Sequence, residues 1–197
     1  MDMWNACIAA LEKRAGNEGR VAISDSERRH ASLGRVADRS VDLAQGSAIF
    51  AKYSQEKRYI TAKNISFDLF VSFYDVNSSS ALVARIPKPM GSKGHKMLKK
   101  SLSHIKNPNI EARILGLQDG DKALLAEIKE FRKNYGSHLM EADLFGKNVR
   151  HVVLDLKVGI LYDLLLLDRI YKPGELANTQ RAEDFVSGAK ELSFVEG

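Results

Sequence analysis

Residues 65–73 carry the pattern that most constrains how this chain can fold. Hydrophobic side chains occupy every second position of this stretch, and the positions between them are mostly polar. This period of two is typical of a half-buried β-strand. Turn-forming residues at 75–80 lead to a second apolar run at 81–86, which is ended by Pro87 and Pro89. The sequence therefore predicts two strands joined by a polar loop.

Helices are predicted before and after this strand pair along the chain. Residues 2–15 repeat apolar side chains at intervals of four and three, and residues 92–106 place a hydrophobic stripe opposite a row of lysines. Residues 26–57, which are rich in Ala and Arg, are interpreted as a loosely specified helix. Asn107 is a favoured N-cap residue followed by a proline, so it predicts the start of a further helix.

Residues 108–134 admit two interpretations. Apolar residues spaced alternately four and three apart, with one polar member, form a heptad-like seam: Ile110, Ile114, Leu117, Asp121, Leu124, Ile128 and Phe131. One continuous helix fits this spacing, because the apolar phase is unbroken across Gly120. The alternative is a turn at residues 118–121, which would make residues 110–117 a strand. We prefer the single helix.

Residues 139–171 are predicted to form a long helix. Between residues 158 and 167 it would be apolar nearly all round, which is typical of a helix buried in its own fold or against a second subunit. This surplus of apolar helix surface favours a homodimer. A short amphipathic helix at residues 178–192 is expected to close the chain.

Positive charge is concentrated in one window, residues 85–106. The chain holds 30 Lys and Arg against 25 Asp and Glu, a net charge of +5, whereas this window alone has seven basic residues and no acidic one. Clustered cations of this kind are typical of a surface that binds a polyanion. The other interpretation is a solvated loop and helix face that happens to be rich in lysine.

Several classes of protein are disfavoured by what the sequence lacks. One cysteine cannot form an intrachain disulfide or a Cys-based zinc cluster. No stretch approaches a membrane span and the start lacks a signal-peptide pattern, so a location in the bacterial cytoplasm, associated with the nucleoid, is expected. The common hydrolase, metalloprotease and P-loop motifs are missing, so we expect no enzyme activity and no cofactor. Acidic residues that could in principle bind metal are assigned to the surface or to helix caps: Asp119, Asp121, Glu141 and Asp143.

The basic window is predicted to bind double-stranded DNA. Arg85 is the expected base reader, because guanidinium pairs bidentately with guanine, whereas lysines contact phosphate and carry no sequence information. Arg58 and Lys63 would join this surface if the fold brings them near. The full set of predicted DNA contacts is Arg58, Lys63, Arg85, Lys88, Lys93, His95, Lys96, Lys99, Lys100 and Asn107.

The order of these elements resembles the ribbon-helix-helix class of DNA-binding proteins. A short strand (81–86) is followed by a helix (93–105), a turn and a second helix capped by Asn107. The resemblance implies that two subunits pair their strands into a ribbon in the major groove, with Ala81, Val83 and Arg85, or the residues that alternate with them, facing it. It also implies that Asn107 and Asn109, at the start of the second helix, lie near a phosphate.

As a whole, the chain resembles transcriptional regulators carried by conjugative plasmids and integrating conjugative elements. The predicted fold is α+β and mostly helical, with a ribbon-helix-helix-like core. It consists of a small β-hairpin at about 58–87 and packed helices at about 92–106, 108–134 and 139–171. The predicted parts of the chain are an N-terminal helical segment (1–57), the core (58–172) and a C-terminal tail (173–197).

The function expected from this resemblance is sequence-specific binding of duplex DNA by a dimeric regulator of conjugative transfer genes. One alternative is a non-catalytic assembly or relaxosome-type accessory protein whose basic window docks an acidic partner. A second is a metal-dependent nucleic-acid enzyme. RNA is a further alternative within nucleic-acid binding. Few aromatic residues are interleaved with basic ones to stack single-stranded bases, so duplex DNA is favoured. Neither a membrane nor a small-molecule ligand is expected as a partner.

Overall fold

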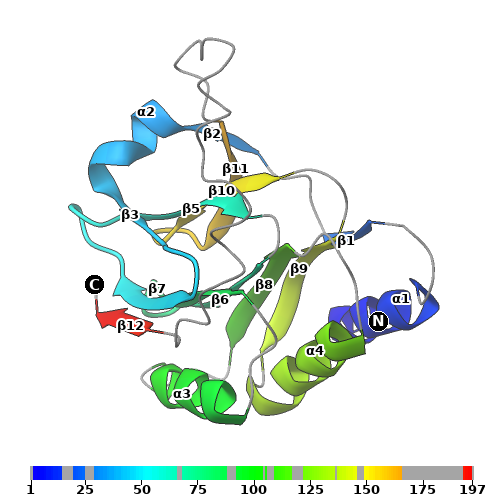
Figure 1. Ribbon diagram of the computed structural model, residues 1–197. Coiled ribbons are helices and arrows are strands. Elements are labelled where there is room, and N and C mark those ends of the chain that lie inside the picture. The colour runs from blue at the N-terminus through cyan, green and yellow to red at the C-terminus, as the bar shows by residue number, and fades with distance from the viewer. Residues whose placement is uncertain are drawn as a thin grey trace.

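The structure, a computed structural model, is a three-layer arrangement of one set of helices and two β-sheets (Figure 1). It describes residues 2–14, 20–24, 29–65, 68–87, 92–103, 105, 109–116, 122–135, 137–145, 149–165 and 193–196. A seven-stranded sheet lies in the middle, with helices on one face and a five-stranded sheet on the other.

The seven-stranded sheet is mixed. Its spatial order is β1 (Val21–Ser24), β9 (His138–Leu144), β8 (Ile110–Gly116), β6 (Leu69–Asp75), β7 (Ser80–Ile86), β4 (Ser47–Lys52) and β12 (Ser193–Glu196). At its centre β6 pairs antiparallel with both β7 and β8, whereas β8 and β9 run parallel. Parallel neighbours need a crossover, and here it contains α4 (Lys122–Tyr135).

The five-stranded sheet is assembled from segments far apart in the chain. Its order is β2 (His30–Ser32), β11 (Ile160–Leu165), β10 (Arg150–Asp155), β5 (Tyr59–Ile65) and β3 (Ser40–Asp42). The short helix α2 (Leu33–Val36) and the 3-10 turn η1 (Ala37–Arg39) connect β2 to β3. This sheet packs on the larger one through a shared hydrophobic core.

Strand β6 shows why the larger sheet is buried on both faces. Leu69, Val71 and Phe73 point to the helical side, and Phe70 and Tyr74 point to the five-stranded sheet. Alternate residues of a strand face opposite sides, so a strand between two layers buries every residue. All seven residues of β6 are buried.

Three helices cover the outer face of the seven-stranded sheet. They are α1 (Met3–Arg14), α3 (Ser92–Leu102) and α4. Trp4 and Cys7 of α1, Leu98 of α3, and Ile128 and Phe131 of α4 belong to one hydrophobic core with that sheet. The helices therefore share an outward-facing surface on the side away from the second sheet (Figure 1).

Several local predictions are confirmed. The strand pair is β6 and β7, joined by a turn at residues 76–79. The N-terminal helix is α1, and the lysine-bearing helix is α3. Within residues 108–134 the rejected alternative is right, because the segment forms β8 and then α4.

The predicted fold class is wrong, because the protein is mostly β. The largest error is the long helix at 139–171, which is instead β9, β10 and β11. In β10, Val152 and Leu154 face the large sheet while Val153 packs against Val36 of α2. A strand covered on both faces reads as a continuous apolar run rather than an alternating one, which is why its period was misread.

The helix predicted at 26–57 is also wrong. This segment contains β2, α2, η1, β3 and β4. Four of these elements have only three or four residues, which is too short to show a period. The closing helix predicted at 178–192 lies outside the described residues.

The ribbon-helix-helix-like core is contradicted by the position of β7. In that class the strand pairs with a second subunit, whereas β7 is hydrogen-bonded on one side to β6 and on the other to β4. Neither edge of β7 is free. The strand also lies between two hydrophobic cores, so it cannot enter a DNA groove.

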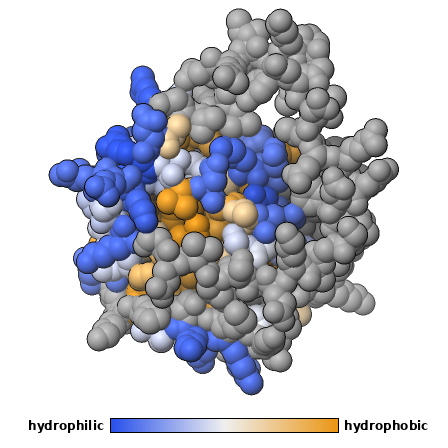
Figure 2. Space-filling view, turned by 60° about the vertical axis from the view of Figure 1, so that its left-hand side comes forward, coloured by the Kyte–Doolittle hydropathy of each residue, from blue (hydrophilic) through white to orange (hydrophobic). Residues whose placement is uncertain are grey.

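The surface is unevenly polar. One face shows a central hydrophobic patch bordered by hydrophilic residues on its left and upper right (Figure 2). Among the described residues, the large hydrophobic side chains that are most exposed are Val76, Val149, Val158 and Ile160. No helix in the described part of the chain has the length and hydropathy needed to cross a bilayer.

Candidate nucleic-acid interface

Helix α3 separates its apolar and basic side chains onto two faces. Leu98 and Leu102 are buried, whereas Lys96, Lys99 and Lys100 are exposed. Lysines near a helix C-terminus interact favourably with the helix dipole, and both Lys99 and Lys100 lie in the last turn. We call Lys96, Lys99 and Lys100 the lysine face.

His95 fixes this orientation from the inner side of the helix. Its Nδ1 lies 3.0 Å from the hydroxyl of Tyr135, and its Nε2 lies 3.2 Å from a carboxylate oxygen of Glu127, both on α4. The ring of Phe131 meets the imidazole edge-on, with centroids 5.6 Å apart. His95 is therefore a packing residue between α3 and α4 rather than the predicted phosphate contact.

Tyr135 remains a neutral phenol in this cluster. Burial raises its pKa well above the ordinary value, and the carboxylates of Glu127 and Glu130 raise it further. A neutral hydroxyl can donate one hydrogen bond and accept another. Tyr135 also lies within donating distance, 3.3 Å, of the main-chain oxygen of His95, so it ties α4 to both the side chain and the backbone of α3.

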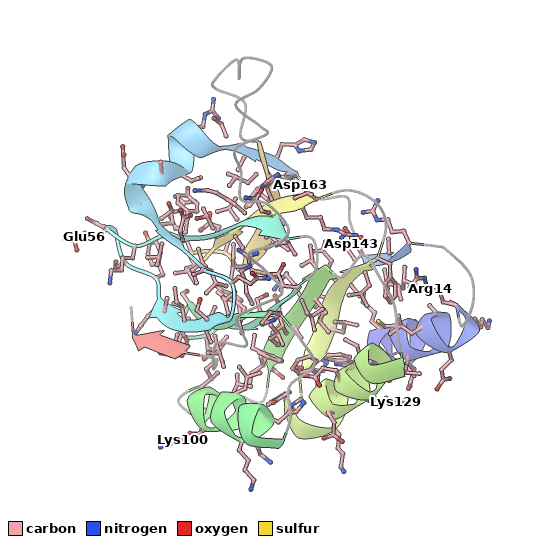
Figure 3. All side chains as sticks on the ribbon, viewed as in Figure 1. Arg14, Glu56, Lys100, Lys129, Asp143 and Asp163 are labelled. Atoms are coloured by element: carbon pink, nitrogen blue, oxygen red, sulfur yellow. The ribbon has the colours of Figure 1, made fainter. Side chains whose placement is uncertain are left out.

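The lysine face differs from two basic residues of α4, Lys129 and Arg132, because it is not neutralised. On α4, Lys129 pairs with Glu12 at 2.7 Å and Arg132 pairs with Asp2 at 3.2 Å. Helix α3 has four lysines and no acidic residue, and its three exposed lysines make no ion pair within the described part of the chain. Figure 3 shows Lys100 at α3 and Lys129 at α4, on the same outer side of the molecule.

Arg85 does not contact solvent in the way a base reader must. The residue is 6% exposed and its guanidinium pairs with the buried carboxylate of Asp68. The same guanidinium donates to the main-chain oxygens of Leu43 and Asn64, each at 3.3 Å. Arg85 therefore holds three loop and strand segments together inside the protein.

Arg58 and Lys63 lie away from the lysine face. Both belong to the region of β5 in the five-stranded sheet, on the opposite side of the large sheet from α3. Arg58 donates to Asp155 at 2.6 Å, and these hydrogen bonds raise the pKa of its guanidinium. Lys63 pairs with Asp42 at 2.8 Å. The two cations are thus engaged in ion pairs within their own sheet.

The pKa of Asp42 is lowered by its hydrogen-bond partners. Burial pushes the pKa of the carboxyl upward, but hydrogen bonds from Lys63 and Thr61 outweigh burial and hold it below the ordinary value. Nearby His151 has a lowered pKa because the ring is half-buried and because Lys63 and Arg85 place positive charge close to it. These groups belong to the five-stranded sheet and do not form part of the lysine face.

Three predicted contacts cannot be placed with the others. Lys88 and Asn107 lie outside the described residues, and Lys93 belongs to α3 but its side chain is not described. Of the ten predicted residues, the structure brings together Lys96, Lys99 and Lys100 on one exposed surface.

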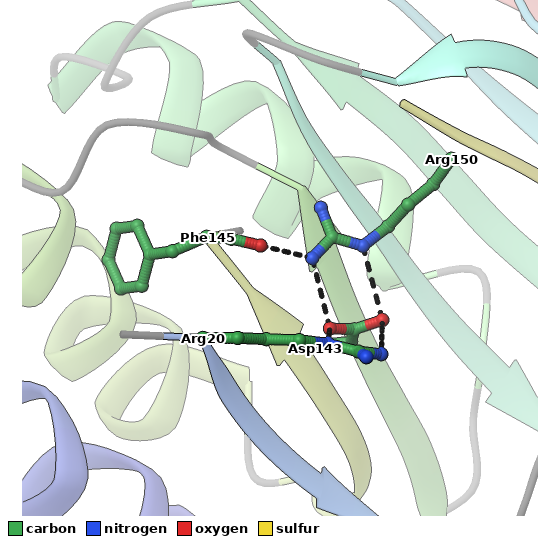
Figure 4. Close-up of polar contacts among 4 residues, drawn as sticks. All are labelled: Arg20, Asp143, Phe145 and Arg150. Atoms are coloured by element: carbon green, nitrogen blue, oxygen red, sulfur yellow. Dashed lines mark hydrogen bonds and ion pairs between the residues drawn. The ribbon is translucent and has the colours of Figure 1, made fainter. Parts of the chain in front are cut away.

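The sequence interpretation missed a charged cluster around Asp143 (Figure 4). This carboxylate, assigned to the surface, is buried between the guanidinium groups of Arg20 and Arg150. Arg150 also donates to the main-chain oxygen of Phe145, and the bond to Asp143 raises the pKa of Arg20. The three charged residues of this cluster, Arg20, Asp143 and Arg150, are spread over 130 positions of the sequence. No local motif therefore pointed to the cluster.

No protein-family model matches the chain, and no curated protein matches it. Within the described residues, no three His, Cys, Asp or Glu side chains are grouped so that they could hold a metal ion.

Proposed function

We propose that this protein binds double-stranded DNA, and that the lysine face of α3 contacts the phosphate backbone. The observation that carries the proposal is that Lys96, Lys99 and Lys100 are exposed together on a helix with no acidic residue. Helix neighbours three and four positions apart lie about 5–6 Å from each other. The three ammonium groups can therefore reach neighbouring phosphates of one strand.

Duplex DNA is favoured over single strands because no aromatic ring on α3 faces solvent beside the lysines. Binding of single strands combines a basic groove with aromatic side chains on which bases stack. His95 is the only ring on α3, and it faces α4 rather than solvent. The lysine face thus offers charge without stacking.

Base reading by Arg85 is not part of this proposal, because its guanidinium is buried against Asp68. The proposed contact is with the backbone, which positions a protein on DNA without reading sequence. Regulation of conjugative transfer genes by a homodimer is proposed on the whole-chain resemblance alone. Two copies of the lysine face in a dimer would double the number of phosphate contacts.

The test is the affinity for a 30-base-pair duplex, measured by fluorescence anisotropy from 50 to 200 mM salt. Three phosphate contacts per protein copy predict a slope of log K against log salt of about −2.7, or about a 40-fold loss over this range. A dimer that uses both lysine faces would double the slope to about −5.4. The triple variant Lys96→Gln/Lys99→Gln/Lys100→Gln should lose this dependence and bind at least about tenfold more weakly at 50 mM salt.

A matched control removes the same charge elsewhere. Lys52, Lys57 and Lys157 are also exposed but lie outside the helical layer, so Lys52→Gln/Lys57→Gln/Lys157→Gln should bind nearly as well as the wild type. Equal weakening of both triple variants would show an effect of net charge alone and refute the proposal. Tighter binding of an acidic protein than of duplex DNA would instead support the assembly-protein alternative and refute it too.

A further inference from the structure

A hollow of about 550 Å³ lies where the start of α1 meets the end of α4 and the start of β9. Its lining consists of residues 2–4, Arg132 and residues 137–139. The helices α1 and α4 pack side by side here (Figure 1). Small-molecule sites typically have volumes of about 300–1,000 Å³, so the hollow is large enough for a small ligand.

The polar groups of this wall have unused capacity to donate hydrogen bonds. Arg132 carries five N–H donors, and its one hydrogen bond within the described part of the chain runs from Nη2 to Asp2. The Oγ of Ser137 has no hydrogen-bond partner although the residue is only 9% exposed. His138 adds an exposed imidazole, which carries at least one N–H.

The single carboxylate of the wall, that of Asp2, already accepts two hydrogen bonds. Asp2 caps α1, because its Oδ1 accepts a hydrogen bond from the backbone N–H of Trp4 at 3.1 Å. Its Oδ2 accepts the bond from Arg132 at 3.2 Å. The unused hydrogen-bonding groups of the hollow are therefore mostly donors, and the complementary ligand is rich in acceptors.

The wall is also held in place before any ligand binds. The indole N–H of Trp4 donates to the main-chain oxygen of Ser137 at 2.7 Å, and this hydrogen bond is buried. It ties the first turn of α1 to the residue that precedes β9. The N-terminus of α1 adds the positive end of a helix dipole beside Ser137 and Arg132.

We propose that this hollow binds a small ligand through a carboxylate or phosphate group, with Arg132 and Ser137 as its hydrogen-bond donors. The site is separate from the lysine face and uses none of its residues. It departs from the expectation, drawn from the sequence, that no small molecule is bound.

Trp4 supplies the measurement, because it is the only tryptophan of the chain and lines the hollow. Its fluorescence is followed while the full chain is titrated with inorganic phosphate or with succinate, and sodium chloride keeps the ionic strength constant. A saturable change is expected with at least one anion. A preference between the two identifies the phosphate or the carboxylate as the group recognised.

Three variants assign the response to the wall. Losing a charged hydrogen bond in Arg132→Gln should weaken binding at least about tenfold, and Ser137→Ala, which removes an unpartnered hydroxyl, about threefold. Asp2→Asn should bind more tightly, because asparagine still caps the helix but no longer competes for Arg132 or repels an anion. Lys133→Gln removes an exposed charge beside Arg132 that does not line the hollow, and it should bind like the wild type.

Two results would overturn the proposal. One is the absence of any saturable change with either anion. The other is a change of equal size in the wild type, Arg132→Gln and Ser137→Ala, which would mean that the anions act on the protein surface in general.

Discussion

Arg150 of β10 donates two hydrogen bonds to the carboxylate of Asp143 in β9, at 3.1 and 3.0 Å (Figure 4). The two residues are close in sequence but belong to different sheets. Arg20 donates two further bonds to the same carboxylate, at 2.7 and 2.8 Å. The Arg150–Asp143 pair therefore links the two sheets close to the connection between β9 and β10, where the chain passes from one sheet to the other.

Asp143→Asn and Arg150→Gln should each destabilise the fold. Removing one member of a buried ion pair leaves the other charge uncompensated, which costs about 3–5 kcal/mol. For a chain of this length that lowers the melting temperature by roughly 6–20 °C. Thermal unfolding followed by circular dichroism measures the shift.

Arg20→Gln is the matched control for that cluster. Its side chain is 56% exposed, so the bond to Asp143 is partly screened by water, and the loss should be about 1 kcal/mol or less. A loss as large as that of Arg150→Gln would contradict the view that the inner pair carries the stability.

Arg85→Gln should affect stability and leave DNA contacts intact. The substitution leaves the carboxylate of Asp68 buried without its guanidinium partner, at a cost of about 3–5 kcal/mol. Urea unfolding measures this loss, and duplex affinity is then compared at equal folded concentration. A variant of wild-type stability that binds DNA more weakly would show that Arg85 contacts DNA after all.

Gly159→Ala should be more harmful than Gly46→Ala, although both glycines have positive φ, +69° and +73°. A Cβ at position 159 would overlap the ring of Tyr74, whereas one at position 46 meets only a side-chain carbon of Pro87, at 3.9 Å. Backbone strain costs about 1–2 kcal/mol at either site, and the overlap adds about 1–3 kcal/mol at 159. Equal losses in chemical unfolding would contradict the overlap.

Cys7 should be unreactive in the folded protein at pH 8. Burial raises the pKa of its thiol to about 11 from 9.0, and the thiolate is the reactive form. Because it is the only cysteine, labelling by a thiol-specific dye reports unfolding directly. Labelling in buffer at the rate seen in denaturant would contradict the buried position.

The same thiol makes stability depend on alkaline pH. The unfolded chain loses the proton above its pKa of 9.0, whereas the folded protein keeps it until about pH 11. Stability is therefore unaffected below pH 9 and falls between pH 9 and 11, by about 2–3 kcal/mol in total from this group. Cys7→Ala should show a smaller fall over this range.

Prediction from the sequence succeeded where a segment is covered on one side. Helix α3 presents lysines to solvent and leucines to the core, so the helical repeat of its apolar residues could be recognised in the sequence. The strand pair β6 and β7 is an exception, because it is covered on both faces. It was found from the polar residues within β6 and from its turn, where Asp75 accepts a hydrogen bond from the N–H of Asn77 at 3.0 Å.

Prediction failed for other segments that are covered on both sides. The turn after β10 uses the same chemistry as the turn after β6, since Asp155 accepts a hydrogen bond from the N–H of Lys157 at 2.9 Å. The isolated Gly159 marked this turn, but the apolar residues around it were taken as one helix. The heptad-like seam arose similarly, because Ile114 of β8 and Ile128 of α4 face one common core.

Of the candidate interface, the exposed lysines of α3 could be predicted from the sequence, but the burial of Arg85 could not. Exposed lysines on an amphipathic helix can be assigned from the period of that helix alone. The burial of Arg85 could not be, because its partners Asp68, Asn64 and Leu43 come together only through the packing of the two sheets.

The pairing of early strands with late ones bears on how the protein is made. Strand β1 pairs with β9 and β2 with β11, each across more than 100 residues of chain. A ribosome releases the chain from its N-terminus, so these first strands emerge long before their partners exist. Contacts of such long range also slow folding, because loop closure must precede them. The nascent chain therefore exposes unpaired strand edges for most of its synthesis, and its yield in a cell should depend on chaperones that shield them.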